Sequence, residues 1–212
     1  MNTFVLDFET TGLNPYHNEI IEIAVKKYDT DLIYKDLVKP ELINGRYVTD
    51  RIIDITGIMN QDIDEHGIPQ STACENMFNF IKENSEPDKP IYIMAHNGKM
   101  FDFPYLMMLV RRYKREATEV DILIVLETYN RMIFLDTLLL ARLVLPTHAR
   151  HSQKALCESY NIVQTNAHRA FGDVIALEKI YRSIMREHIV RHDLPEDFID
   201  DTNNVIAMLS NI

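Results

Sequence analysis

The chain has 212 residues, of which 46% are hydrophobic and 25% are charged, and these proportions suit one globular domain with a sizeable core. No run of about 18 uncharged apolar residues occurs and the N-terminus lacks the basic head of a secretory signal, so we expect no membrane span and an intracellular location, cytoplasmic or nuclear. The formal net charge of −10 argues against a generally anion-binding surface, although bound cations can reverse the field inside a cleft.

The first 40 residues are predicted to form three consecutive strands. The segment TFVLDFE, residues 3–9, alternates along its length and is rich in β-forming residues. Two further strands are expected over residues 19–28 and 31–40, with a tight connection between them. This pattern predicts an antiparallel meander. Residues 40–70 are predicted to be irregular, because Gly and Pro punctuate them.

Helices and strands alternate in the rest of the chain. Helices are expected over residues 71–84, 102–117, 152–161 and 172–190, and strands over residues 89–97 and 131–135, the second running into a helix closed by Pro146. Ser71 or Thr72 is the expected cap of the first helix. This order predicts an α/β or α+β sheet with helices on its faces. The final residues, 193–212, are acidic and then apolar, and they either dock as a short helix or stay mobile.

Two acids lie close together in the first predicted strand. Asp7 and Glu9 are two residues apart, so their side chains point to the same face of the sheet, roughly 6 to 7 Å from each other. Two carboxylates beside apolar neighbours are costly unless a cation lies between them. Mg²⁺ and Mn²⁺ prefer such oxygen ligands. A polar strand edge that faces water is the alternative.

Three further residues extend this pattern, although each has an ordinary explanation by itself. Asp102 follows a predicted strand where a helix begins, and Asp173 starts the long last helix, so either residue alone is explained as a helix cap. His168 alone is explained as a solvated loop residue. Together with Asp7 and Glu9 they provide four carboxylates and one histidine, a set that fits a two-metal phosphodiesterase. The histidine is suited to accept a proton from water.

Three motifs carry a resemblance to a known family. LDFETTG (residues 6–12), AHNGKMFDFPYL (95–106) and HRAFGDVIAL (168–177) resemble, in order, the three exonuclease motifs of the DEDDh 3′→5′ exonucleases, the DnaQ-like superfamily. Within that superfamily, these motifs and the upstream DITGI (54–58) are most similar to three-prime repair exonucleases of the TREX type. The motifs span residues 4–177, most of the chain, and three in order are far more specific than any one.

The resemblance implies a fold, a cofactor and a mechanism. The fold is ribonuclease H-like, with a mixed central sheet in which a three-strand antiparallel meander is joined by parallel strands and flanked by helices. Asp7, Glu9 and Asp173 would bind the first of two Mg²⁺ ions, Asp7 and Asp102 would hold the second, and Mn²⁺ can substitute. His168 would be the general base. The reaction would release 5′-mononucleotides from the 3′ end of DNA, preferably a single-stranded or frayed end.

The resemblance also implies contacts to the substrate. Leu13 would wedge against the terminal base, while backbone groups of Thr10 and Thr11 would reach the 3′-hydroxyl. Gly12 belongs to the same predicted contact segment, and Ile55, Thr56 and Gly57 would form the wall on the opposite side of the nucleotide. Asn97 would lie near the scissile phosphate. Lys99, beside the second motif, and Arg169, beside His168, are candidate phosphate partners.

Several alternatives stay open at this point. The enzyme could act on RNA, because DEDDh exoribonucleases share the same acids, or it could be a proofreading subunit of a polymerase. A catalytically silent nucleic-acid-binding module of the same fold is a third alternative. Residues 114–131 follow no family pattern, and residues 31–40 form a candidate edge strand for a homodimer, as in TREX-type enzymes. We expect an exonuclease domain over residues 1–192 and a tail or docking helix over residues 193–212.

Overall fold

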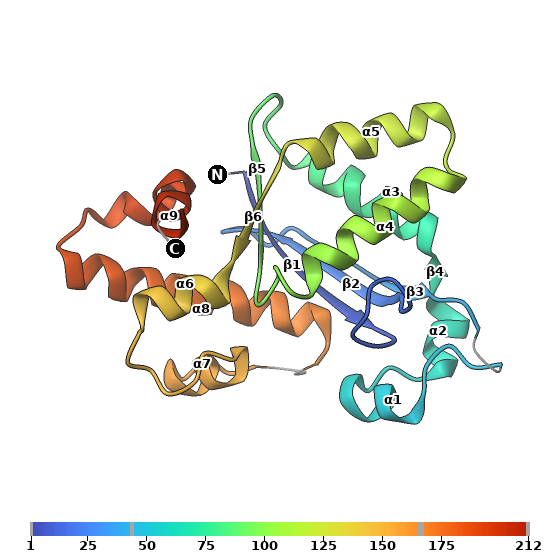
Figure 1. Cartoon of the computed structure of the whole chain (residues 1–212), viewed down its shortest axis with the longest axis horizontal. Coiled ribbons are helices and arrows are strands. Elements are labelled where there is room, and N and C mark those ends of the chain that lie inside the picture. The colour runs from blue at the N-terminus through green and yellow to red at the C-terminus, as the bar shows by residue number, and fades with distance from the viewer. Residues whose placement is uncertain (1, 43–44, 165–167, 211–212) are drawn as a thin grey trace.

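A computed structural model describes residues 2–42, 45–164 and 168–210. A mixed six-stranded sheet lies at its centre, in the order β4-β3-β2-β1-β5-β6 (Figure 1). The strands are β1 (Thr3–Thr10), β2 (Ile20–Lys27), β3 (Ile33–Lys39), β4 (Ile68–Pro69), β5 (Ile91–Ala95) and β6 (Met132–Asp136).

The pairing of the strands confirms the predicted sheet. Strands β1, β2 and β3 form an antiparallel meander, whereas β5 is parallel to β1 and β6 is parallel to β5. The alternation in β1 separates two faces: Phe4, Leu6 and Phe8 enter one core cluster and Val5 enters the other. Asp7 and Glu9 therefore share the face of Val5.

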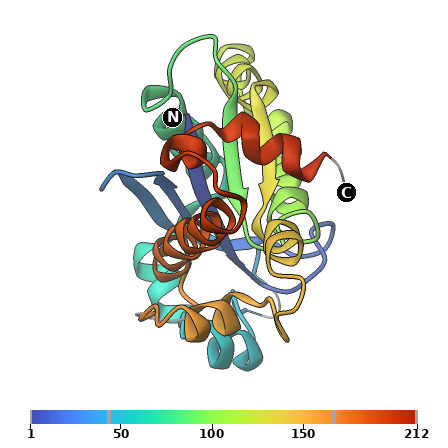
Figure 2. The same ribbon diagram turned by 90° about the vertical axis from the view of Figure 1, so that its left-hand side faces the viewer.

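Helices cover both faces of the sheet (Figures 1 and 2). The cluster around Phe4, Leu6 and Phe8 includes residues of α3, α4 and α5, and the cluster around Val5 includes residues of α6, α7, α8 and α9. The helices are α1 (Asp50–Thr56), α2 (Asn60–His66), α3 (Gln70–Glu83), α4 (Asp102–Glu116), α5 (Glu119–Asn130), α6 (Thr137–Val144), α7 (Gln153–Ser159), α8 (Ala170–His192) and α9 (Thr202–Leu209), with a 3₁₀ turn η1 (Glu196–Asp200) before α9.

Two predictions in the region before residue 72 are wrong. Residues 40–70 contain the helices α1 and α2 as well as the short strand β4. Each helix has only seven residues, so local sequence alone is a weak signal, and both are held by a buried cluster that includes Ile21, Ile58 and Ile63. Neither Ser71 nor Thr72 caps α3, because the helix begins one residue earlier, after Pro69.

Residues 114–131, which follow no family pattern, complete one core. The helix α4 ends at Glu116, and α5 begins after Thr118, whose side chain accepts a hydrogen bond from the N–H of Asp121. Val125 of α5 is buried in the cluster that contains Phe4, Leu6 and Phe8. These residues are therefore a covering helix of the sheet.

The helix α9 lies against the N-terminal ends of β1 and β5 (Figure 2). Thr202 shares a hydrogen bond of 3.2 Å with Thr3, Asn203 accepts one of 3.0 Å from the Tyr92 hydroxyl, and Val205 is buried. Within the described ranges, no helix combines the length and the apolar character needed to cross a membrane.

Candidate active site

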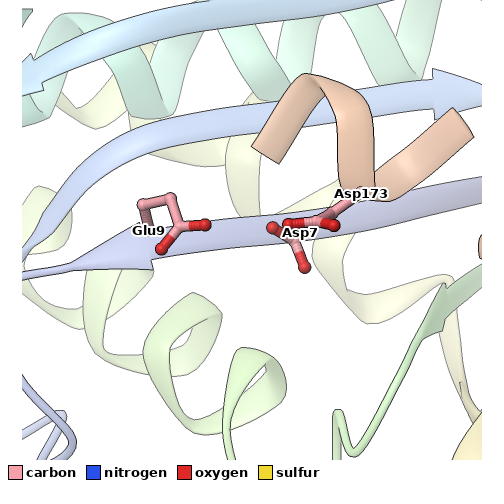
Figure 3. Close-up of side chains that lie close together, drawn as sticks. All are labelled: Asp7, Glu9 and Asp173. Atoms are coloured by element: carbon pink, nitrogen blue, oxygen red, sulfur yellow. The ribbon is translucent and has the colours of Figure 1, made fainter. Parts of the chain in front are cut away.

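Three predicted metal ligands meet on one face of the sheet. Asp7 and Glu9 extend from β1, and Asp173 reaches them from the first turn of α8 (Figure 3). One carboxylate oxygen from each residue lies within 4.8 Å of those of the other two. Because α8 packs across β1 and β2, the sheet and the helix together bring these acids into contact.

Asp173 is held by two glutamines that sequence reasoning did not identify. The side-chain amide of Gln153 donates to Asp173 Oδ1 at 3.0 Å and to the Asp173 carbonyl at 3.2 Å, and the amide of Gln164 also donates to Oδ1. Asp173 is the fourth residue of α8. Its carboxylate therefore does not serve as a helix cap, which removes the alternative explanation for it.

Asp102 reaches the same site from the opposite side of β1. It is 2% exposed, and its Oδ1 accepts a hydrogen bond of 3.2 Å from the N–H of Phe8, the residue between Asp7 and Glu9. Asp102 is the first residue of α4 and follows the N-cap position, which is Phe101. Its carboxylate thus joins α4 to β1.

The acids perturb one another strongly. Burial, followed by the charges of Asp102 and Asp173, raises the pKa of Asp7 well above its usual range. Burial, followed by the charge of Asp173, raises the pKa of Glu9 to about 8. Burial also raises the pKa of Asp102 to about 8, although the Phe8 N–H opposes this shift. Buried carboxylates this close together need positive charge to ionise at neutral pH.

The donor set fits hard divalent cations. The four acids offer only oxygen atoms, the ligands that Mg²⁺ and Mn²⁺ prefer. Burial, together with mutual repulsion, raises the pKa values of these acids, so a bound cation would favour their ionised forms. Asp7, Glu9 and Asp173 could hold one ion.

His168 lies directly before α8, and its side chain is exposed. Its charge lowers the pKa of Asp173, which is otherwise raised mainly by burial. The imidazole therefore lies near the Asp173 carboxylate. Its backbone has a φ of +63°, a left-handed conformation that is uncommon for a residue other than glycine.

Arg169, a predicted phosphate partner, makes a different contact. Its Nε and Nη2 donate to Glu22 Oε1 at 3.0 and 2.7 Å, and Nε is also 3.2 Å from Glu22 Oε2. Glu22 lies on β2 directly opposite Glu9. Sequence reasoning did not identify Glu22, because only the paired strands bring it near the motif that contains Arg169.

The loop that carries the predicted nucleotide contacts follows β1. Leu13 is 81% exposed. The Thr10 hydroxyl donates to the Gly12 carbonyl at 2.5 Å, and the Thr11 N–H already donates to the Glu19 carbonyl at 2.9 Å. A side chain at Gly12 would meet that of Asn18 within 3 Å. A larger residue at position 12 would thus have to displace the Asn18 side chain, and the loop presents Leu13 to solvent.

Two side chains of α4 hold this loop. The Tyr105 hydroxyl donates to the Gly12 carbonyl at 2.7 Å. Arg112 Nη2 donates to the carbonyls of Pro15 and Asn18 at 3.2 and 3.1 Å, and its Nη1 is 3.5 Å from a carboxylate oxygen of Glu19. The helix that begins with a predicted metal ligand therefore also fixes the predicted nucleotide loop.

The predicted opposite wall lies at the end of α1. Ile55 is exposed, whereas the Thr56 hydroxyl is buried, donating to the Ile52 carbonyl and accepting from the Ile58 N–H. Gly57 ends α1 with a φ of +71°, which favours glycine. Ile55 is thus the side chain of this wall that is open to a ligand.

Asn97 and Lys99 lie in the turn after β5, and both are exposed. Their N–H groups donate to the two carboxylate oxygens of Asp136 at 3.1 and 3.0 Å, and Asp136 also caps α6 by accepting from the Leu138 N–H. Asp136, which sequence reasoning did not single out, is a buried anchor for this turn.

Comparison with known proteins identifies the family. Residues 4–181 match the RNase_T family model, described as Exonuclease, and the chain belongs to this family of nucleases, which is metal-dependent. The predicted resemblance to DEDDh (DnaQ-like) exonucleases is confirmed.

Two relatives illustrate the match in sequence. The chain is 29% identical over 196 residues to "Exonuclease DPD1, chloroplastic/mitochondrial" of Arabidopsis thaliana, covering 87% of this chain and 56% of that protein. It is 31% identical over 180 residues to the PolC-type DNA polymerase III of Thermotoga petrophila, covering 84% of this chain and 11% of the polymerase. The chain thus spans about half of the first relative and about a tenth of the second.

The fold is similar to that of part of exonuclease I. One structure of that enzyme superimposes with a TM-score of 0.64 at 17% identity, over 84% of this chain and 39% of the enzyme. The Escherichia coli enzyme in complex with a dT13 oligonucleotide gives the same TM-score and identity over 88% of this chain and 40% of the enzyme. The predicted ribonuclease H-like fold is confirmed.

Proposed function

We propose that the protein is a metal-dependent 3′→5′ exonuclease that hydrolyses phosphodiester bonds at the 3′ end of DNA and releases 5′-mononucleotides. The convergence of Asp7, Glu9 and Asp173, with the Asp102 carboxylate hydrogen-bonded to the strand residue between Asp7 and Glu9, in a chain of the exonuclease family carries this proposal. Single-stranded or frayed ends are the preferred substrates. Two Mg²⁺ ions are the proposed cofactors, and Mn²⁺ can replace them.

The acids have distinct proposed roles. Asp7, Glu9 and Asp173 would hold the first ion, and Asp7 and Asp102 would hold the second. When bound, the ions supply positive charge for the scissile phosphate and for the leaving 3′ oxygen, and they lower the pKa of the attacking water. His168 accepts the proton of that water at its imidazole. Its exposed position beside Asp173 supports this role.

The predicted substrate contacts fall into three groups. Leu13 and Ile55 are the exposed apolar side chains proposed to pack against the terminal base. Thr10, Thr11, Gly12, Thr56 and Gly57 shape the backbone around them, and Asn97 lies near the scissile phosphate. Lys99 is the proposed phosphate partner, and Arg169 can take part only through Nη1 and the second N–H of Nη2 while Glu22 binds its Nε and the other N–H of Nη2.

DNA is proposed over RNA as the substrate. PolC is named as a DNA polymerase, and E. coli exonuclease I has been seen with single-stranded DNA. A DEDDh exoribonuclease remains the alternative. Digestion of 5′-labelled DNA and RNA oligonucleotides of the same sequence, with Mg²⁺, Mn²⁺ or chelator, tests all parts together. We expect a ladder that shortens from the 3′ end, faster on DNA and absent in chelator. Faster cleavage of RNA would favour the alternative.

Mutation of Asp7 to Asn distinguishes an enzyme from a silent binding module. We expect the Asp7→Asn variant to fold and to lose its nuclease activity. If the wild-type protein and the variant show the same trace of activity, the silent binding module is favoured. A proofreading subunit is tested by co-purification with a polymerase. The match to PolC covers 84% of this chain and 11% of the polymerase.

Three broader assignments are also proposals. We assign residues 1–192 to the exonuclease domain and 193–212 to a docking segment, and we place the protein in the cytoplasm or nucleus. A homodimer is supported by β3, because β4 pairs only with Val38 and Lys39 and the remainder of β3 has no second partner strand among the described residues. A sedimentation mass equal to one chain would remove the dimer.

A further inference from the structure

A fifth carboxylate lies beside the four proposed metal ligands and is not one of them. Glu22 is 5% exposed and lies on β2 directly opposite Glu9. Its charge raises the pKa of Glu9, so the two carboxylates are close. Glu22, like Asp102, falls outside the group of acids whose oxygen atoms come together, which contains Asp7, Glu9 and Asp173; what separates Glu22 from the proposed ligands is that its two oxygen atoms already accept hydrogen bonds from Arg169 and Ala170.

Both oxygen atoms of Glu22 are engaged by the start of α8. Oε1 accepts from Arg169 Nε and Nη2 at 3.0 and 2.7 Å, and Oε2 accepts from the Ala170 N–H at 2.8 Å. Ala170 is the first residue of α8, and the side chain of Arg169 at the N-cap position makes no capping hydrogen bond. Glu22 therefore caps α8 from the neighbouring sheet, where a negative charge is favourable.

His168 directly precedes the two residues that Glu22 binds. A left-handed φ of +63° is costly for histidine and persists only where the surroundings hold it. The hydrogen bonds from Arg169 and Ala170 fix the chain immediately after it. Loss of these bonds would allow His168 to leave that conformation and would move its imidazole relative to Asp173.

We propose that Glu22 is a positioning residue that holds His168, through Arg169 and Ala170, in the place from which it acts as general base. This inference rests on the proposed function of His168. It assigns Arg169 mainly to the contact with Glu22 and not to the substrate phosphate. A misplacement of about 1 Å in a catalytic group can lower a rate by about 100-fold. Loss of the hydrogen bonds from Arg169 and Ala170 to Glu22 should therefore have a measurable effect on kcat.

The chain offers a matched control on the same two elements. Lys26 of β2 and Glu178 of α8 form a second buried ion pair. Glu178 is eight residues beyond Ala170, which corresponds to about 12 Å along the helix. Glu178→Gln therefore weakens a contact between the same strand and the same helix without touching the residues next to His168.

The first experiment compares Glu22→Leu, Glu22→Gln and Glu178→Gln. We expect kcat on a 5′-labelled oligonucleotide to fall by about 100-fold in Glu22→Leu and by about 10-fold in Glu22→Gln, whose amide oxygen can still accept from Ala170. KM and the Kd for Mn²⁺, measured by calorimetry, should change less than about twofold. Glu178→Gln should keep kcat within about twofold. A Glu22→Leu variant that keeps wild-type kcat, or that loses Mn²⁺ binding, would overturn the proposal.

The second experiment repeats the substitution in a His168→Ala background. If Glu22 acts only through His168, Glu22→Leu should lower kcat by less than about twofold there. An equal loss in both backgrounds would show that Glu22 acts on the metals or on the fold instead. If His168→Ala alone leaves kcat unchanged, the proposed function of His168 fails, which is a distinct result. Glu22→Gln serves in the cycle if the leucine variant does not fold.

Discussion

The Asp102 carboxylate accepts a hydrogen bond of 3.2 Å from the backbone N–H of Phe8. This bond joins the first residue of α4 to the strand position between Asp7 and Glu9. A carboxylate from one side of the sheet is thereby brought beside two from the other side, and its charge raises the pKa of Asp7. Three acids therefore meet at one site, and Asp102 is bonded to the strand that carries two of them.

Asp102→Asn should separate charge from structure at this site. The asparagine oxygen can still accept from the Phe8 N–H, so we expect the fold to persist, while the rate with Mg²⁺ falls by about 100-fold or more because one ionic ligand is lost. The melting temperature in chelator should not fall, because one buried, mutually repelling carboxyl is removed. Asp88→Asn, at an exposed residue, is the control with the same change of charge. More than a tenth of wild-type activity in Asp102→Asn would contradict its proposed role.

The stability of the metal-free protein should fall as pH rises from 6 to 9. Burial raises the pKa of Glu9 and of Asp102 to about 8, above their values in the unfolded chain. Groups with raised pKa values in the folded state contribute stability that is complete below the unfolded pKa, roughly 4, and is lost as pH passes the folded pKa.

Divalent ions should reduce this loss, because they bind the ionised acids. Melting curves at pH 6 and pH 9, in chelator and in Mg²⁺, measure both effects. We expect the ion to raise the melting temperature more at pH 9 than at pH 6. The double variant Glu9→Gln/Asp102→Asn should flatten the pH dependence in chelator. A wild-type protein that becomes more stable between pH 6 and pH 9 in chelator, with no flattening in the variant, would refute the assignment.

Gln153→Leu should weaken metal binding at Asp173. The Gln153 amide donates to both the carboxylate and the carbonyl of Asp173, and such outer contacts typically change metal affinity by about 10- to 100-fold. We expect the Kd for Mn²⁺ to rise by about 10-fold in calorimetry. Gln61→Leu, on the exposed side of α2, provides the control. Equal affinities in the two variants would exclude this function for Gln153.

Arg112→Met should raise KM more than it lowers kcat. Arg112 holds the carbonyls of Pro15 and Asn18 in the loop that presents Leu13, so the variant must order this loop when substrate binds. Ordering costs of about 1 kcal/mol correspond to a roughly fivefold rise in KM. Arg111→Met changes an exposed neighbour on the same helix and should leave KM unchanged. A loss confined to kcat in Arg112→Met would contradict this role.

Removal of residues 193–212 should destabilise the exonuclease domain without abolishing its activity. The segment contributes the buried Val205 and the contacts of Thr202 and Asn203 to β1 and β5, whereas the metal ligands lie elsewhere. We expect a lower melting temperature with kcat within about threefold. Val205→Asp, which buries a charge, should lower the melting temperature of the full chain similarly. A truncated chain that does not fold would contradict the proposed boundary at residue 192.

The local sequence pattern predicts those site residues that lie together in one strand, at one helix start or in one short motif. The alternation of β1 predicts that Asp7 and Glu9 share a face, and the strand-to-helix junction at Asp102 predicts an acid near the sheet edge. Spacing within the last motif likewise predicts that His168 and Asp173 belong to one site. These residues were identified because each motif is short and continuous.

The remaining features depend on contacts between distant segments. Glu22 and Arg169 are 147 residues apart, and Gln153 meets Asp173 only after α7 packs on α8. The helices α1 and α2 are too short to be predicted from their own residues and are held by Ile21, Ile58 and Ile63. No local sequence pattern encodes such pairs. The sequence therefore predicts Arg169 to be a phosphate partner, whereas the structure pairs it with the carboxylate of Glu22.

An anomalous difference map from a crystal soaked in Mn²⁺ tests the central claim most directly. We predict one strong peak between Asp7, Glu9 and Asp173 and a second between Asp7 and Asp102, with both absent in a crystal of Asp7→Asn. A wild-type crystal without manganese between β1 and the start of α8 would contradict the proposed metal-dependent cleavage.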